Sequence, residues 1–333
     1  MKILGIESTC DETGAAVVEN GTKVLANSLA TSALEHARFG GVVPEVAARE
    51  QVKVLVPTLA SAVKDVNFDS IDAIAVSYGP GLIGSLLVGV ESAKALALAW
   101  EKPLIPVNHL VGHIYSNWLE AKRLPQFPLI GLVVSGGHTD LVYMRNSRDF
   151  NLIGSTLDDA AGEAFDKVAR YLGLPYPGGP QIEKAAIGFC GVAGKNPFPV
   201  SMAGKDNSDF SFSGIKTAVV RYVEKNHLKL TNNYISMVAF YFENAVVDSI
   251  ASRVKKSATS YKVRSLVIGG GVAANKRLRR ALLRVASETK TEVYFPKIGF
   301  SVDNGAMIAA AAFFAGKPVD PLTIQADSGL HFD

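Results

Sequence analysis

The chain has 333 residues, of which 48% are hydrophobic and 20% are charged. This balance is typical of a globular protein with a large core, allows two domains of ordinary size, and excludes a chain that is mainly disordered. The formal net charge of +3 is too small to indicate nucleic-acid binding by itself.

Cysteine content and the first residues predict the cellular compartment. The two cysteines, Cys10 and Cys190, cannot form a disulfide framework, and the chain runs from Met1 into a strand pattern with no signal peptide. The apolar stretch 86–100 is interrupted by Glu91 and Lys94 before it reaches the roughly 18 to 20 residues of a membrane span. We therefore expect a cytoplasmic protein with no membrane contact.

The first third of the chain is predicted to mix strands and helices. Short β-rich runs at 2–7 and 14–18 flank the polar stretch 8–13, a connection of the kind that carries functional residues. Hydrophobic spacing then predicts a strand at 23–29, a helix at 45–63, a strand at 71–76 and, after the glycine-rich loop 79–84, a long helix that ends near Trp100.

Two of the six histidines, His109 and His113, follow the strand-like run 103–107. Residues four apart lie on one face of a helix, so both imidazoles are candidates to bind one metal ion. A histidine pair in the core or in solvent is the alternative. Leu110 stands where the zinc peptidase motif places its general-base glutamate, which argues against a peptidase.

The second half of the chain begins like the first. Residues 129–134 repeat the apolar-Gly-apolar pattern of 3–6, the polar turn 135–140 follows, and strands are predicted at 141–144 and 151–154 before a helix from Asp159. This pattern indicates a duplicated unit with a period too long for a solenoid. Two such lobes facing each other would place both polar turns at a shared cleft.

A buried strand at 265–268 ends in the glycines 269–271, and a basic helix follows from about Asn275. A strand, a glycine turn and a helix N-terminus together suit a phosphate or nucleoside. The loop is not a Walker A motif, since Asn275 precedes Lys276. The basic residues form either a solvated helix face or a nucleic-acid contact: Lys276, Arg277, Arg279, Arg280 and Arg284.

Asp303 lies close before the apolar helix predicted at 306–314. It is a candidate N-cap of that helix and equally a candidate metal ligand.

Ten motifs in order cover nearly the whole chain: Gly5–Thr13, Gly40–Glu45, Gly79–Leu82, Asn108–His113, Val134–Thr139, Asp158–Lys167, Tyr176–Pro180, Phe210–Thr217, Gly269–Asn275 and Asp303–Met307. Together they resemble the tRNA adenosine threonylcarbamoyltransferases, the bacterial TsaD family, formerly called O-sialoglycoprotein endopeptidases or glycoproteases. The chain departs from many bacterial relatives at Asn108, where they carry a further histidine.

The resemblance implies an α/β fold of the actin-like, sugar kinase and Hsp70 ATPase (ASKHA) type, with two similar lobes and a cleft between them. We expect residues 1–107 and the C-terminal segment 311–333 to form the first lobe, and residues 108–310 the second. It also implies transfer of a threonylcarbamoyl group from threonylcarbamoyl-adenylate to the exocyclic amine of adenosine 37, in tRNAs that read codons beginning with A, with release of AMP.

The resemblance further implies a set of site residues. His109, His113 and Asp303 match the family's metal ligands, for Fe²⁺ by family or else Zn²⁺. Residues matching the family's donor-binding and nucleotide-binding positions are Val133, Val134, Ser135, Gly136, Gly137, Asp166, Gly179 and Asn275. A tight hairpin alone would also explain the paired glycines at 136 and 137, and Asp166 alone would pass for an exposed helix residue.

Asp11 matches the family's acidic residue in the first turn. An ordinary aspartate, with a pKa of about 3.9, is a weak base, so we favour a role in positioning the amine over full proton abstraction. Glu12 either shares this role or simply caps the turn. Cys10 is assigned no covalent role, because the donor already carries a good leaving group.

The resemblance implies tRNA as substrate, a paralogous dimerisation partner (TsaB-like), a small P-loop ATPase (TsaE-like), and a separate synthase that supplies the adenylate. The alternative function is an ASKHA-type nucleotide-binding ATPase or scaffold without acyl transfer. Turnover of ATP without modified nucleoside in tRNA would identify that alternative.

Overall fold

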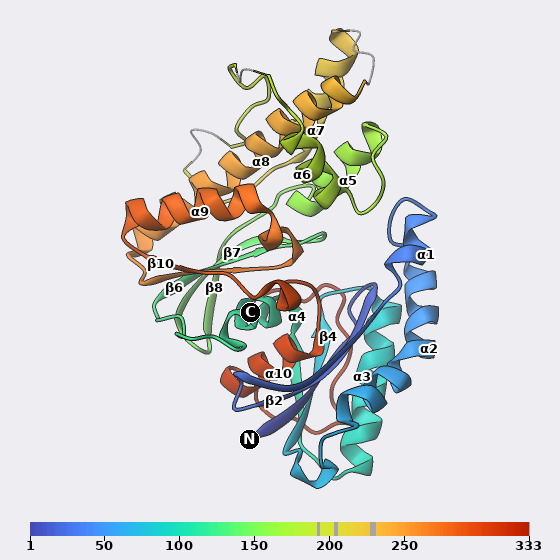
Figure 1. The fold of residues 1–333 in the computed structure, drawn as a ribbon. Coiled ribbons are helices and arrows are strands. Elements are labelled where there is room, and N and C mark those ends of the chain that lie inside the picture. Colours follow the sequence, from blue (N-terminus) through green and yellow to red (C-terminus); the bar gives the residue numbers. More distant parts are fainter. Residues whose placement is uncertain (192–193, 203–205, 227–230, 333) are drawn as a thin grey trace. The chain divides into compact units, whose positions relative to one another are not determined.

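A computed structural model describes the chain except residues 192–193, 203–205, 227–230 and 333 (Figure 1). The chain divides into two compact units. Unit 1 contains Met1–Pro125, Asn146–Phe150 and Phe295–Asp333, and unit 2 contains Gln126–Arg145 and Asn151–Tyr294.

The sheet of unit 1 has five strands, with β1 at its centre. The strands are β1 (Lys2–Glu7), β2 (Glu12–Glu19), β3 (Lys23–Thr31), β4 (Ala73–Gly79) and β5 (Leu104–Asn108), in the spatial order β3-β2-β1-β4-β5. β1 pairs antiparallel with β2 and parallel with β4, and β3 and β5 complete the two edges. The inner strands are buried almost throughout, which explains their nearly continuous apolar sequence.

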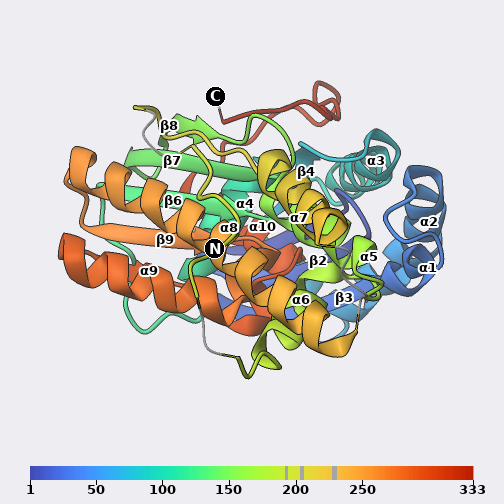
Figure 2. The same ribbon diagram turned by 90° about the horizontal axis from the view of Figure 1, so that it is seen from above.

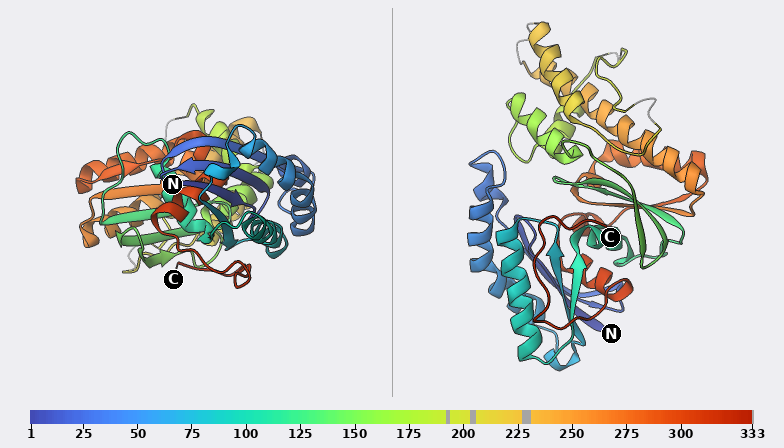
Figure 3. Two further views of the ribbon diagram at one scale, coloured as in Figure 1. Left: turned by 90° about the horizontal axis from the view of Figure 1, so that it is seen from below. Right: turned by 180° about the vertical axis from the view of Figure 1, so that it is seen from behind.

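Helices cover both faces of this sheet. They are α1 (Ala33–Ala37), α2 (Pro44–Val63), α3 (Ile83–Ala99), α4 (His109–Tyr115) and α10 (Gly305–Phe314), with short 3₁₀ turns at Phe68–Ser70, Ser116–Trp118 and Ile298–Phe300. α2 and α3 lie on one face, and α10 lies on the other together with α4 (Figures 1 and 3). α10 is buried nearly all round, since it packs on both β1 and α4.

The close approach of α10 to the sheet depends on glycine. An added Cβ at Gly305 would lie 2.5 Å from the Gly5 carbonyl oxygen, and one at Gly14 would lie 2.6 Å from the Gly305 nitrogen. Real side chains do not tolerate such distances to backbone. The glycines therefore let the start of α10 rest directly on β1 and β2, and they fix the position of Asp303 two residues earlier.

The sheet of unit 2 has β6 at its centre. Its strands are β6 (Leu129–Val134), β7 (Thr139–Asn146), β8 (Asp149–Ser155), β9 (Ser265–Gly269) and β10 (Glu292–Tyr294), in the order β10-β9-β6-β7-β8. β6 pairs antiparallel with β7 and parallel with β9. This repeats the topology of unit 1 strand for strand and confirms the predicted duplication.

The helices of unit 2 are α5 (Ala161–Tyr171), α6 (Gly178–Ile187), α7 (Ser213–Lys225), α8 (Asn232–Tyr261) and α9 (Lys276–Thr289), with a 3₁₀ turn at Gly271–Ala274. α8 and α9 pack together and lie over the strands in Figure 2, while α5 packs on α6. Among the residues that the structure describes, no helix is long and apolar enough to cross a membrane.

The two units do not divide at residue 107, where we placed the lobe boundary. Residues 108–125 and 295–310, expected in the second lobe, belong to unit 1. The physical reason is packing, because α4 and α10 bury their apolar surfaces against each other and against the first sheet.

Candidate functional site

Three predicted metal ligands come together in unit 1. His109 is the first residue of α4, His113 lies one turn later, and Asp303 lies just before α10. Their ligand atoms all lie within 4.8 Å of one another. Asp303 Oδ1 is 3.1 Å from His113 Nε2 and 3.7 Å from His109 Nε2. Residues 190 positions apart in sequence thus form one candidate ligand set.

Helix capping decides whether the Asp303 carboxylate is available as a ligand. Asn304 Oδ1 accepts a hydrogen bond from Met307 N at 2.9 Å and is the N-cap of α10, so Asp303 is not the cap. Asn108 caps α4 by accepting from Leu110 N at 2.9 Å. Asparagines therefore take both capping roles, and the Asp303 carboxylate is turned to the histidines.

The residues fit a metal ion. His113 is fully buried, yet neither of its ring nitrogens has a hydrogen-bond partner within the described part of the chain. Its approach to Asp303 is close but lacks hydrogen-bond geometry. An unpaired imidazole in the core costs free energy unless something else binds its nitrogen. Two imidazoles and one carboxylate would satisfy a divalent transition metal and leave coordination positions open.

Glu7 supports this group and was not predicted from the sequence. It ends β1, is completely buried, and places Oε2 3.0 Å from His109 Nδ1, while its Oε1 accepts from Thr9 N at 2.7 Å. A carboxylate on Nδ1 fixes the imidazole so that Nε2 faces the metal position. Burial lowers the pKa of His109, but the charges of Glu7 and Asp303 outweigh it and raise that pKa to about 9.

The first polar turn lies between β1 and β2 in the same unit. Burial, followed by the negative charges of Asp303 and Asp11, raises the pKa of Glu12 to about 10. The same causes raise the pKa of the Cys10 thiol well above its usual range, so Cys10 is a neutral thiol rather than a nucleophilic thiolate. The negative charge of Asp303 thus contributes to the raised pKa of both Glu12 and Cys10.

In unit 2 the corresponding turn joins β6 and β7 and contains most of the predicted donor-binding residues. Val133 and Val134 are buried in β6, and Ser135 N donates to the His138 carbonyl at 2.9 Å. The Ser135 carbonyl accepts from Gly162 N at 3.1 Å, so the start of α5 closes on the turn. An added Cβ at Gly162 would lie 2.5 Å from that carbonyl oxygen.

Three glycines of unit 2 have no such packing reason. An added Cβ at Gly136, Gly137 or Gly179 would meet nothing within 4 Å, and none of the three has a positive φ. Neither protein packing nor backbone conformation therefore requires glycine at these positions. Bare backbone beside open space is what close approach of a ligand requires.

The other two predicted positions of unit 2 bind backbone N–H groups at helix starts, Asp166 from within α5 and Asn275 as the N-cap of α9. Asp166 Oδ1 accepts from Gly178 N at 2.6 Å, at the start of α6. Asn275 caps α9 by accepting from Leu278 N at 2.8 Å and donates from Nδ2 to Glu243 Oε1 at 2.7 Å. Glu243 is a buried carboxylate that the sequence analysis missed, and burial raises its pKa.

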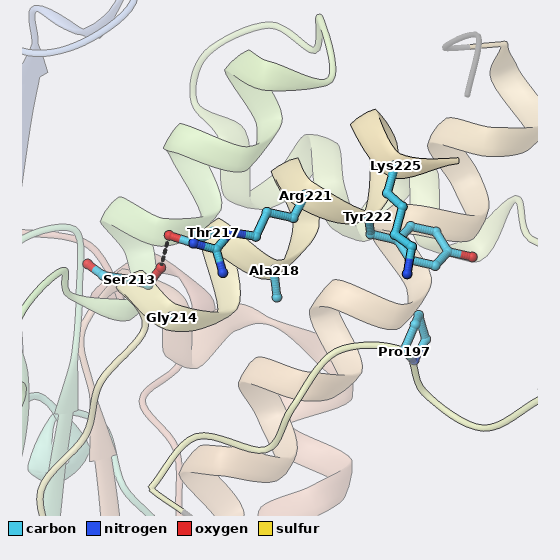
Figure 4. A pocket seen from close by; sticks show the side chains of 8 residues that line it. All are labelled: Pro197, Ser213, Gly214, Thr217, Ala218, Arg221, Tyr222 and Lys225. Atoms are coloured by element: carbon cyan, nitrogen blue, oxygen red, sulfur yellow. Dashed lines mark hydrogen bonds between the residues drawn. The ribbon is translucent and has the colours of Figure 1, made fainter. Parts of the chain in front are cut away.

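A surface hollow of about 570 Å³ lies elsewhere in unit 2, along α7 (Figure 4). It is lined by Pro197, Ser213, Gly214, Thr217, Ala218, Arg221, Tyr222 and Lys225. None of the predicted site residues lines it. Its two cations project from one side of α7, and no carboxylate contributes to its wall.

Comparison with solved structures concerns the fold. Full-length HypF in its phosphate- and nucleotide-bound form is similar with a TM-score of 0.60 and 14% identity, over 94% of this chain and 55% of that one. A ROK family glucokinase from Streptomyces griseus gives a TM-score of 0.50 and 13% identity, over 95% and 99%. These likenesses confirm the two-lobed α/β fold of the sugar kinase type.

Comparison of sequences concerns the family. The family model described as TsaD, tRNA N6-adenosine threonylcarbamoyltransferase, matches residues 23–310. Proteins of that name from Moorella thermoacetica and Clostridium botulinum are 48% and 49% identical, over 97% and 94% of this chain and 95% and 92% of their own length. The chain belongs to the tRNA N6-adenosine threonylcarbamoyltransferase family, TsaD.

Proposed function

We propose that this enzyme transfers the threonylcarbamoyl group from threonylcarbamoyl-adenylate to the exocyclic amine of adenosine 37, in tRNAs that read codons beginning with A. The amine nitrogen bonds to the carbamoyl carbon, the bond from that carbon to the phosphate oxygen breaks, AMP leaves with the electron pair, and the amine loses a proton. The observation that carries the proposal is the group His109, His113 and Asp303 close to the acidic turn of the same unit.

We propose Fe²⁺ at the metal position, with Zn²⁺ as the alternative. When bound, such an ion supplies a Lewis acid that anchors the anionic donor and polarises the carbonyl under attack. His109 and His113 offer imidazole nitrogens as ligands, and Glu7 fixes the orientation of His109.

The two acidic residues of the first turn take different roles. Burial, followed by the charges of Asp303 and Asp11, raises the pKa of Glu12 and so favours the protonated carboxyl group, which can donate a hydrogen bond. Asp11 accepts from the attacking amine and orients it, in keeping with the positioning role expected from the sequence.

We propose that the donor is bound by the unit 2 residues Val133, Val134, Ser135, Gly136, Gly137, Asp166, Gly179 and Asn275. The glycines without packing contacts support this assignment because they leave backbone N–H groups accessible to phosphate or carbonyl oxygens. Asp166 places its carboxylate at the start of α6, beside Gly178, and Asn275 keeps one amide hydrogen beyond its bond to Glu243.

The decisive experiment supplies the purified enzyme with adenylate donor, unmodified tRNA and the accessory proteins, and measures threonylcarbamoyladenosine in the tRNA digest. His113→Ala should abolish product and metal binding. His331→Ala is the matched control, since the His331 side chain is exposed and the substitution keeps the backbone carbonyl that accepts from Asn108 Nδ2. Normal modification by His113→Ala or by metal-free enzyme would contradict the metal-dependent mechanism.

The tRNA substrate requires a basic surface, and α9 suits it less than the sequence suggested. Arg277 donates from Nε to Glu243 Oε2 at 2.8 Å and stacks on Phe240, and Arg279 donates to the Ala273 carbonyl at 2.7 Å. These two arginines thus have structural partners inside unit 2. Both arginines are therefore less available for a nucleic-acid contact than the sequence pattern of α9 indicated.

The hollow along α7 offers a better phosphate surface. Arg221 and Lys225 are exposed, and within the described residues neither forms an ion pair with a carboxylate (Figure 4). Four residues of helix separate the two cations by about 6 Å along the axis, and the hydroxyls of Ser213 and Thr217 continue the same row. We therefore assign tRNA phosphate contacts to this row.

Salt dependence of tRNA binding tests the assignment. The double variant Arg221→Gln/Lys225→Gln should lower the slope of log affinity against log salt by about one for each lost charge. Arg280→Gln/Arg284→Gln, which removes two exposed cations of α9, should leave the slope unchanged. The reverse pattern would return the contact to α9.

For the protein partners, we propose a paralogous TsaB-like subunit, a TsaE-like P-loop ATPase and a separate synthase of the adenylate, acting in the cytoplasm with the tRNA. The surface that supports a protein partner lies on α2 and α3, where Val52, Val56, Ile83 and Leu87 are 45% to 69% exposed. Val56→Glu should weaken binding of the paralogue, and Leu322→Glu, at another exposed leucine of unit 1, should not.

A further inference from the structure

The turn that carries Asp11 is held through three consecutive carbonyl groups. Gln51 Nε2 donates to the Cys10 carbonyl at 2.9 Å and to the Glu12 carbonyl at 3.2 Å. Between them, the Asp11 carbonyl accepts from Ser32 N at 2.9 Å and from Ser32 Oγ at 3.0 Å. Gln51 from α2 and Ser32, at the N-cap of α1, therefore hold the backbone on both sides of Asp11.

His36 determines the direction of the Ser32 hydroxyl. Val43 N donates to His36 Nδ1 at 3.3 Å, so this nitrogen is the acceptor of the fully buried imidazole, and the proton of neutral His36 sits on Nε2. Nε2 lies 3.1 Å from Ser32 Oγ and donates to it. The Ser32 proton is then available only for the Asp11 carbonyl, which makes a relay with one orientation.

The carbonyl groups of the turn determine the orientation of the Gln51 amide. The side chain is 1% exposed, and its Oε1 has no hydrogen-bond partner among the described residues. The opposite amide orientation would place that oxygen against two carbonyl oxygens. The unpaired oxygen is thus the cost of holding the carbonyls of residues 10 and 12 with one nitrogen.

We propose that Ser32, oriented by His36, and Gln51 are positioning residues that fix Asp11 for the acyl transfer. The proposal rests on the proposed function, in which Asp11 orients the attacking amine. None of the three contacts the metal ligands by a hydrogen bond that the structure describes, and their effect on the reaction passes through the backbone of residues 10–12.

Steady-state kinetics of the complete enzyme system test Ser32. Ser32→Ala keeps the backbone hydrogen bond but loses the hydroxyl, so kcat should fall about tenfold while KM for the donor and metal content stay unchanged. Ser32→Thr restores a hydroxyl and should recover most of the turnover. Wild-type kcat in Ser32→Ala, or a loss that Ser32→Thr does not relieve, would overturn the positioning role of Ser32.

A double-variant cycle tests the relay. His36→Gln can keep a donor where Nε2 lies, whereas His36→Asn is too short, so His36→Asn should lose more turnover than His36→Gln. Ser32→Ala/His36→Asn should be little worse than the more impaired single variant, because both substitutions break one chain of bonds. Independent, multiplying losses would show that His36 does not act through Ser32.

Gln51→Met separates positioning from stability. It removes the unpaired oxygen but also the donor shared by the carbonyls of residues 10 and 12, so kcat should fall about tenfold or more, well beyond any loss explained by a lower melting temperature. Unchanged kcat would contradict the role of Gln51, and so would a loss of kcat that merely follows the fraction unfolded. If the wild-type enzyme itself forms no product, the proposed function fails. If the wild-type enzyme forms product and these variants form it equally fast, the positioning proposal fails while the proposed function stands.

Discussion

The two polar turns occupy equivalent places in two sheets of the same topology, yet they differ in chemistry. The turn after β1 contains carboxylates, is held by Ser32 and Gln51, and lies close to the histidine pair of its unit. The turn after β6 contains Ser135, Gly136 and Gly137, and its glycines border open space. The shared topology gives both turns the same framework, and their side chains separate a candidate metal and acid site from a surface where bare backbone is accessible.

The largest expected effect concerns the buried carboxylate of the first unit. Glu7→Gln should weaken metal binding by about 10- to 100-fold, because His109 loses the charged partner that orients it. Metal titration of the purified variant measures this effect. Strand β6 of unit 2 has no carboxylate equivalent to Glu7. Equal metal affinity in wild type and variant would therefore show that this buried charge does not distinguish the two turns.

Two glycines sharpen the account of the second turn. Gly162→Ala should lower the free energy of unfolding by about 1–3 kcal/mol, because its Cβ meets the Ser135 carbonyl. Gly136→Ala should leave stability unchanged and raise KM for the donor. Denaturant unfolding and donor titration measure the two. A Gly136→Ala variant with normal KM would mean that the open space at this turn is not used by the donor.

A smaller effect concerns pH stability within unit 2. Burial raises the pKa of Asp159, but hydrogen bonds from Lys167 and Lys216 outweigh it and lower that pKa below its ordinary value. The stabilisation is therefore present above the unfolded pKa of about 3.9 and is lost as pH falls through the lower folded value. The difference in the free energy of unfolding between wild type and Asp159→Asn, measured by denaturant unfolding, should shrink below about pH 4. A difference that stays constant with pH would contradict this.

The smallest expected effect is at Cys10. Cys10→Ala should retain nearly full turnover, since burial and the neighbouring carboxylates keep the thiol neutral and the donor is already activated. A loss comparable with that of Asp11→Asn would instead give the first turn a covalent role that the second turn cannot share. Product formation under saturating donor distinguishes these outcomes.

Much of the fold and of the candidate site is readable from local sequence. Alternating and continuous apolar runs predict the strands, and the repeated apolar-Gly-apolar pattern at 3–6 and 129–134 predicts the duplication that the two sheet orders confirm. The helical spacing of His109 and His113 suffices to pair them. The family motifs add Asp303, which local patterns leave open between a cap and a ligand.

Only tertiary structure decides what depends on contacts between distant segments. Packing of α4 and α10 on the first sheet moves the unit boundary away from residue 107, and capping by Asn304 excludes Asp303 as the cap. The partners of His109 and of the first turn, namely Glu7, Ser32, His36 and Gln51, have no spacing rule, because burial and direction depend on the folded chain. Sequence by itself determined the types of chemical group and their local order, while the fold decided which groups meet.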